Sequence, residues 1–319
     1  MRKSSLLKRY HRQILGVLVL AVFMAYFVLN IENFRSLLDI RPVYLMGVAI
    51  CYVAIVITNG LFIKYIIEPF GKKISVRESA RVSLISSLGN FFATSGAGLG
   101  FRAVYLRQKH GLGYGDYVTT LYGNYLLIFI INAIFGLLSL MFVTNKGSVQ
   151  YIGALIFFVL LLLVSLILCF ITLPAAFDKN IKNKHVKKIA TYLKNMTMGW
   201  NRIIRDQRLL VHLVGLITLQ LALTVVIGWL EISALNISIG LPELLLFSVL
   251  GSLSIFVSLT PANLGVKEGI YLLTAGVIGI TTPQIVSIAL VDRGILFGTL
   301  FLLWIFTRSN SRKDKTEHQ

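Results

Sequence analysis

Charged residues are scarce in this chain of 319 residues, and their scarcity limits the class of protein to which it can belong. Charged residues make up 14% of it and hydrophobic residues 56%, with a mean hydropathy of +0.79. Soluble domains carry roughly 25% charged residues, so the composition excludes an ordinary soluble domain and indicates a polytopic membrane protein. Acidic residues are the scarcest, at 13 against 31 lysines and arginines. The basic residues gather between apolar runs, which is an orientation signal of membrane proteins. We therefore do not expect nucleic acid as a partner.

Cysteine and histidine are also rare. Cys51 and Cys169 both fall within apolar runs, and the five histidines show no metal-ligand spacing, so neither a disulfide framework nor a metal site is expected. The glycine fingerprint and Walker motif of nucleotide sites are absent, as is a Gly-x-Ser-x-Gly nucleophile elbow. The longest hydrophilic stretch, 174–208, is too short for an independent catalytic domain. We expect no cofactor and no catalytic residues, and we favour a transporter over an enzyme.

Long apolar runs are what the chain does have. A helix needs about 20 apolar residues to cross a bilayer. Six segments meet this requirement, at 13–30, 43–63, 117–143, 151–173, 209–235 and 284–306. The predicted fold is an all-α integral membrane protein with six full transmembrane helices.

Two further apolar segments, 82–106 and 243–279, are interrupted by helix-breaking residues. The first contains Gly98 and Gly100; the interruption of the second includes Pro261, Asn263 and Gly265. Helix breakers at membrane depth are tolerated only where the freed backbone is buried in protein or lines a wet cavity. Interrupted segments at corresponding places in two halves of a chain indicate the substrate site of a transporter.

Charge placement predicts the topology. The N-terminus and the segment 64–81 each have five basic residues, and 174–208 has nine against two acidic ones, so these should be cytoplasmic. On this reading 82–106 enters and leaves from inside, whereas 243–279 is flanked by uncharged loops and should enter from outside. Both would be re-entrant hairpins. We expect both termini in the cytoplasm of a plasma-membrane protein, with 307–319 as a cytoplasmic tail.

The predicted crossings divide the chain into two repeats, 1–143 and 151–306. Each contains three full crossings, an odd number, so the second repeat should be inverted relative to the first. Inverted repeats with discontinuous elements that meet near the midplane are a recurrent transporter plan. We also expect a half-helix to begin at Leu99-Gly100 and another at Leu264-Gly265.

The charged residues that we expect within the apolar zone of the interrupted segments and the last helix are Arg102, Lys267, Glu268, Asp292 and Arg293. Asp292 should lie about 13 Å deep, where a charge costs at least about 2.5–3.5 kcal/mol. Neighbouring residues of a helix project about 100° apart, so Asp292 and Arg293 should pair elsewhere, with Lys267 and Glu268. Two interpretations remain open. The charges form an ion-pair network that fixes a hairpin, or the cations bind an anionic headgroup while the carboxylates orient them or carry protons.

Two other features have simpler expectations. Glu231 lies near the outer end of its helix, and we expect its side chain to reach water there. Within 174–208 the apolar residues recur at helical spacing among lysines, at Val186, Ile189, Leu193 and Met196. This predicts an amphipathic helix on the anionic leaflet, with a solvated basic linker as the alternative.

Three motifs resemble those of the lysylphosphatidylglycerol synthase transmembrane-domain family. They are Gly98-Leu99-Gly100-Phe101-Arg102-Ala103 in the first half, and Pro261-Ala262-Asn263-Leu264-Gly265-Val266-Lys267-Glu268 and Asp292-Arg293 in the second. Two positions depart from the family's pattern: Gly123-Asn124 stands where the family often has Glu-Arg, and Asn263 stands near a common glycine. The first departure weakens the transfer of any one lipid substrate.

The resemblance implies a flippase-like protein, related to the flippase module of the multiple peptide resistance factor. It would move an anionic phospholipid or lipid-linked headgroup between leaflets. The soluble synthase domain is absent, so we do not expect this chain to make an aminoacyl lipid. Rival interpretations are a membrane-embedded transferase with Glu268 or Asp292 as base, and a non-transporting scaffold. A homodimer or a partner synthase stays open.

Overall fold

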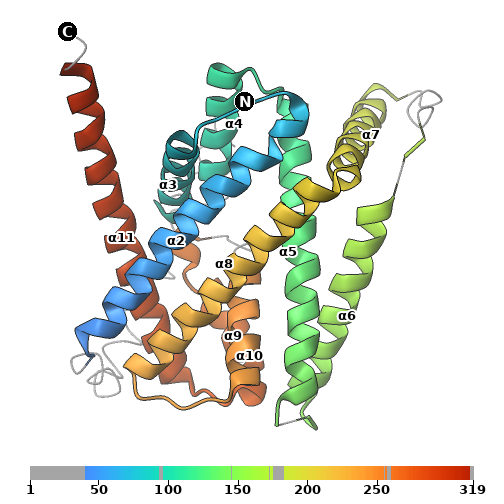
Figure 1. Cartoon of the computed structure of the whole chain (residues 1–319). Coiled ribbons are helices and arrows are strands. Elements are labelled where there is room, and N and C mark those ends of the chain that lie inside the picture. Colours follow the sequence, from blue (N-terminus) through green and yellow to red (C-terminus); the bar gives the residue numbers. More distant parts are fainter. Residues whose placement is uncertain are drawn as a thin grey trace, which may run out of the picture.

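The computed structural model describes residues 40–316 except 93–95, 145, 172, 175–182, 255 and 257–259. These residues form ten α-helices and short 3₁₀ turns, with no strand among them (Figure 1). Five helices are long and apolar enough to cross a membrane, which makes this a multi-pass membrane protein. They are α2 (Pro42–Ile66), α5 (Tyr114–Phe142), α6 (Val149–Phe170), α8 (Gln207–Ala234) and α11 (Thr282–Thr316). They confirm five of the six predicted spans, and the remaining one, 13–30, lies outside the described residues.

The long helices run alternately between two ends of the bundle (Figure 1). At one end α2 finishes, α5 and α8 begin, and α7 (Lys184–Arg205) lies; we call this the α7 end. At the opposite end α2, α6 and α11 begin, and α5 and α8 finish. This alternation is the crossing order that the loop charges predict. Which end faces the cytoplasm stays a prediction.

Both interrupted segments are broken helix pairs. The first pair consists of α3 (Val76–Phe92) and α4 (Ala97–His110), and it lies toward the α7 end. The second consists of α9 (Leu241–Ser254), the 3₁₀ turn η4 (Pro261–Asn263) and α10 (Val266–Ile278), toward the opposite end (Figure 1). Because α3 packs against η4, the first pair contacts the turn of the second inside the bundle. The expected breaks are confirmed; re-entry into a membrane and the inverted repeat stay predictions.

Glycine permits both breaks. Gly96 precedes α4 with φ of +80°, and Gly265 precedes α10 with φ of +83°, a region that residues with a Cβ rarely adopt. Gly98 allows α4 to lie against α3, because a Cβ there would overlap the carbonyl oxygen of Ser86. Gly96 and Gly265 therefore set where the second helix of each pair begins, and Gly98 sets how closely the two helices of the first pair approach.

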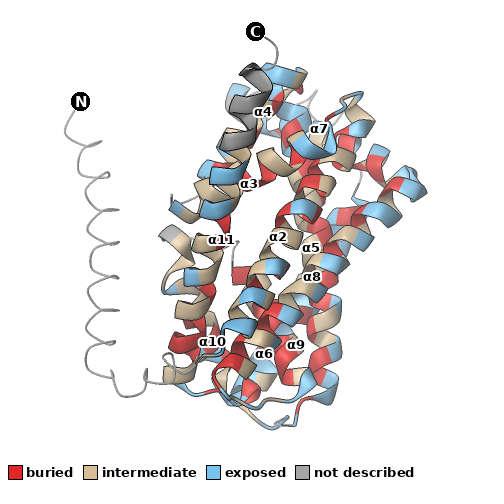
Figure 2. Ribbon diagram, turned by 60° about the vertical axis from the view of Figure 1, so that its left-hand side comes forward, coloured by how far each residue is buried: buried red, intermediate tan, exposed pale blue. Residues whose placement is uncertain are grey.

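Two helices at the surface, α6 and α7, expose the kinds of side chain that the sequence pattern predicts. On α6, large apolar side chains such as Ile152, Ile156 and Ile167 are exposed, which is typical of a lipid-facing helix (Figure 2). The helix α7 buries Trp200 and Ile203 in the bundle and leaves apolar side chains exposed among its lysines. The predicted amphipathic helix is thus confirmed as a helix, and its position on a leaflet stays a prediction.

Candidate functional site

Two ion pairs join α10 to α11. The Lys267 Nζ lies 2.8 Å from the Asp292 Oδ2, and the Arg293 Nη2 lies 2.9 Å from the Glu268 Oε2, with a second Arg293–Glu268 contact through Nη1 and Oε1. The predicted pairing of Asp292 and Arg293 with residues of the second interrupted segment is confirmed. Each helix contributes one cation and one anion. Because successive residues of a helix point apart, each cation pairs with the anion of the other helix. The four charges neutralise one another in two pairs.

The Arg293–Glu268 pair also satisfies the backbone of the turn before α10. Arg293 donates to the carbonyl oxygens of Ala262 and Asn263, both at 3.2 Å, and the Glu268 Oε2 accepts from the backbone N–H of Gly265 at 2.9 Å. Ala262 and Asn263 have φ of +51° and +55°, a conformation uncommon for residues other than glycine. A broken helix inside a membrane protein needs such partners for its freed backbone groups. This pair therefore holds the turn in place.

The Lys267–Asp292 pair belongs to a larger buried cluster. The Tyr52 hydroxyl on α2 donates to the Asp292 Oδ1, and the Lys267 Nζ lies 5.9 Å from the ring centre of Tyr271. Glu231 on α8 lies within hydrogen-bonding reach of Asp292 and is only 2% exposed. The expectation that Glu231 reaches water is wrong. Because α8 packs against α2, α9 and α11, this face of its last turns lies inside the bundle.

Arg102 is the cation that differs from the others. Its side chain on α4 is 8% exposed, and no carboxylate of the described residues lies within ion-pair distance. Its Nε lies 3.4 Å from the Ser86 Oγ, a weak hydrogen bond. The phenol groups of Tyr117 and Tyr125 interact with it electrostatically. Arg102 is thus a buried cation for which the described part of the chain supplies no counter-ion.

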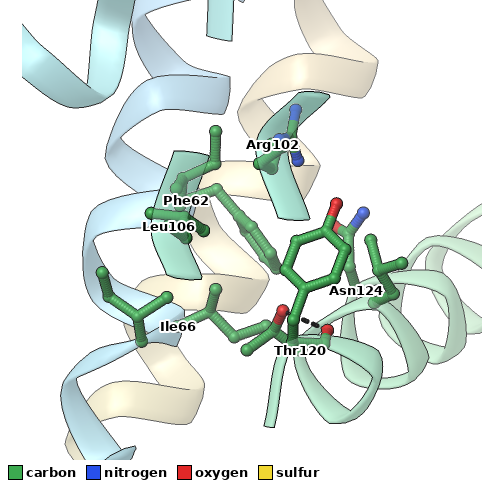
Figure 3. A pocket seen from close by; sticks show the side chains of 10 residues that line it. Phe62, Ile66, Arg102, Leu106, Thr120 and Asn124 are labelled. Atoms are coloured by element: carbon green, nitrogen blue, oxygen red, sulfur yellow. Dashed lines mark hydrogen bonds between the residues drawn. The ribbon is translucent and has the colours of Figure 1, made fainter. Parts of the chain in front are cut away.

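Arg102 lines a pocket between α2, α4 and α5 (Figure 3). Apolar side chains of α2 form one wall, including Phe62 and Ile66, and Leu106 of α4 continues it. Polar side chains of α5, Thr120 and Asn124, form another. The space has an apolar lining, a few polar groups and a positive charge at its wall, but its volume of about 10 Å³ holds no more than about one water molecule. A headgroup would therefore fit beside Arg102 only after the surrounding helices separate.

The other predicted site residues lie at the breaks rather than in this pocket. The N–H of Gly98 donates to the Asn90 Oδ1 at 3.0 Å, and Gly100 faces open space. Pro261 begins η4, and the Asn263 Nδ2 donates to the Ser254 Oγ at 2.9 Å. Gly265 precedes α10 at the predicted position, but α4 begins at residue 97, two residues earlier than expected. The structure therefore separates one group around Arg102 from one around Asp292.

A third cluster lies where α3 begins and α4 ends. The Glu78 Oε1 accepts from the Tyr105 hydroxyl at 2.5 Å, from the Lys109 Nζ at 2.8 Å, and lies 2.9 Å from the His110 Nε2. Burial by itself raises the pKa of Glu78, but the hydrogen bonds from Lys109, Tyr105 and His110 outweigh it and lower that pKa to about 2. This cluster ties the two helices of the first pair together at the α7 end.

Sequence reasoning missed Tyr52, Ser86, Tyr117 and Tyr271 as partners of the buried charges. Tyr52 and Tyr117 were detectable as phenols within apolar helices, since a buried tyrosine hydroxyl usually needs a partner. The Tyr117 hydroxyl donates to the Leu99 carbonyl oxygen at 2.8 Å, beside the first break. No pattern in the sequence connects Tyr52 to Asp292, which lies on a helix 240 positions away.

A family model described as the lysylphosphatidylglycerol synthase TM region matches residues 13–303. The chain belongs to this family. A search of curated proteins finds no match. The residues of both charged clusters and of the Arg102 pocket lie within the matched part of this lysylphosphatidylglycerol synthase TM-region protein.

Proposed function

We propose that this protein is a flippase-like transporter that moves an anionic phospholipid or lipid-linked headgroup between leaflets, with Arg102 as the cation that binds the headgroup. The observation that supports this is a buried arginine at the wall of a partly polar pocket, for which no described residue supplies a counter-ion. A buried unpaired charge is costly, so a site that retains one is a functional candidate. A guanidinium binds phosphate through two parallel hydrogen bonds, which suits a phospholipid headgroup.

The other two cations receive a different role in this proposal. Lys267 and Arg293 are already neutralised by Asp292 and Glu268, so a headgroup would have to displace a carboxylate to bind either one. Breaking such a buried pair is expensive. We therefore assign Arg293 to holding the turn of the second hairpin, and Arg102 to the headgroup.

The arrangement of the two helix pairs supports alternating access. They approach from opposite ends of the bundle, and α3 packs against η4. In this proposal both are re-entrant hairpins of an inverted repeat, the basic α7 end is cytoplasmic, and the protein lies in the plasma membrane. Rocking of one repeat against the other would open the Arg102 pocket to each leaflet in turn.

Purified protein in vesicles tests this proposal. Fluorescent phosphatidylglycerol in the outer leaflet is bleached by a membrane-impermeant reductant, and the slow phase reports translocation. We expect wild type and Arg107→Ala to translocate the lipid and Arg102→Ala to lose the activity. Arg107 is the matched control, an exposed arginine on the same helix whose side chain stacks on Tyr114.

Three outcomes would contradict the proposal. Equal rates for Arg102→Ala and wild type would remove the headgroup cation. A chemically altered product lipid would identify the transferase instead. Folded wild-type protein that moves no lipid would favour the scaffold.

A further inference from the structure

Glu231 on α8 and Asp292 on α11 are two carboxylates that face each other inside the protein. Glu231 is 2% exposed and Asp292 6% exposed, and their side chains lie within hydrogen-bonding reach. The Glu231 Oε1 is buried and has no hydrogen-bond partner among the described residues. Asp292, by contrast, accepts from Tyr52 through Oδ1 and from Lys267 through Oδ2.

The groups that the structure describes around the pair do not supply enough positive charge for both carboxylates. The helix α2 contributes the neutral phenol of Tyr52, and α10 contributes Lys267 and the neutral phenol of Tyr271. On α11, Arg293 is engaged by Glu268.

Among the described residues of the helices packed on α8, Lys267 is the one cation that acts on Glu231. The acidic residue of α9, Glu243, lies apart from the pair and accepts hydrogen bonds from Thr144. Two ionised carboxylates and one ammonium would therefore leave one uncompensated negative charge in a buried site, which is strongly unfavourable.

We propose that Glu231 and Asp292 bind one proton between them, and that this proton is the ion to which lipid translocation is coupled. The proton resides on Glu231, whose O–H donates to the carboxylate of Asp292, while Asp292 stays ionised opposite Lys267. Water supplies the proton on one side of the membrane and accepts it on the other. The coupling of this proton to transport rests on the proposed function. A proton that crosses with an anionic headgroup reduces the net charge carried through the apolar interior.

Infrared spectroscopy tests the proton site without any transport assay. Wild-type protein in nanodiscs at neutral pH should show the C=O stretching band of a protonated carboxylic acid, shifted by exchange into D₂O. Glu231→Gln should lose this band. Glu243→Gln is the matched control, a substitution at another buried glutamate, and should retain it. A band of equal intensity in wild type and Glu231→Gln, or no band in wild type, would overturn the proposal.

A second variant tests the site if Glu231→Gln fails to fold. Tyr52→Phe removes the hydroxyl that donates to Asp292 and leaves both carboxylates in place. We expect the band to persist at a shifted frequency, because the acceptor strength of Asp292 changes. A band unmoved by this change would contradict a proton shared with Asp292.

The coupling is tested in vesicles with an imposed pH gradient. The translocation rate of fluorescent phosphatidylglycerol in wild type should change when the gradient is reversed, and in Glu231→Gln it should not. A wild-type rate independent of the gradient would overturn the coupling. Failure of the proposed function would be distinguishable from failure of the coupling, because the wild type would then move no lipid while the infrared band persists.

Discussion

Arg293 binds Glu268 through two guanidinium nitrogens and, with the same group, holds the carbonyl oxygens of Ala262 and Asn263. One side chain on α11 therefore neutralises a buried carboxylate and satisfies the backbone of the turn before α10. This turn also contacts α3 of the first helix pair. The Arg293–Glu268 ion pair thus positions the turn at which the two broken helix pairs meet.

Removing one member of this pair should destabilise the protein strongly. Glu268→Gln leaves the Arg293 charge buried without its partner, at a cost of about 3–5 kcal/mol. Thermal unfolding in detergent measures the loss. Arg308→Ala, on the same helix but at an exposed position, should unfold close to wild type. Unchanged unfolding of Glu268→Gln would show that the pair does not hold the turn.

The close approach of α3 and α4 should depend on Gly98. Gly98→Ala places a methyl group against the Ser86 carbonyl oxygen and should destabilise the fold by about 1–3 kcal/mol. Gly100→Ala is the matched control, because its Cβ would enter open space and the change raises helix propensity by about 0.5–1 kcal/mol. Equal stability of the two variants would contradict this packing.

Stability at acid pH should depend on Glu78. The pKa of this carboxyl is lowered from 4.5 to about 2, so its interactions stabilise the fold above pH about 4.5 and are lost as the pH falls toward 2. Thermal unfolding between these pH values should show a decline that Glu78→Gln reduces. Glu68→Gln, at a more exposed glutamate paired with Lys64, should decline like wild type. The same decline in all three proteins would refute the assignment.

The sequence predicted much of this architecture because a bilayer imposes strong rules. Length and hydropathy located the spans from 43 onward to within a few residues, and the helix breakers located both interruptions. The pairing of Lys267 with Asp292 followed from charge sign, since each charge in an apolar interior requires an opposite one. The start of α4 was placed too late, because Gly96 rather than Gly100 has the left-handed conformation that begins the helix.

What could not be predicted depends on how helices cross. Glu231 looked like a residue at a water-exposed helix end, and only the packing of α8 against α2, α9 and α11 turns it inward to Asp292. The difference among the three cations has the same origin. Lys267 and Arg293 meet carboxylates of a neighbouring helix, whereas Arg102 faces hydroxyl and phenol groups. Sequence spacing does not contain this information.

Headgroup selectivity tests the central claim most directly. The translocation rates of fluorescent phosphatidylglycerol and phosphatidylcholine are measured in vesicles with wild-type, Arg102→Lys and Arg102→Ala protein. Both lipids offer a phosphate to Arg102, but the trimethylammonium of phosphatidylcholine would bring a second cation beside the guanidinium, and like charges repel. The wild type should therefore prefer the anionic lipid by roughly tenfold, which corresponds to about 1.4 kcal/mol. Arg102→Lys should keep part of this preference and Arg102→Ala should lose it. The same preference in wild type and Arg102→Ala would show that Arg102 does not bind the headgroup.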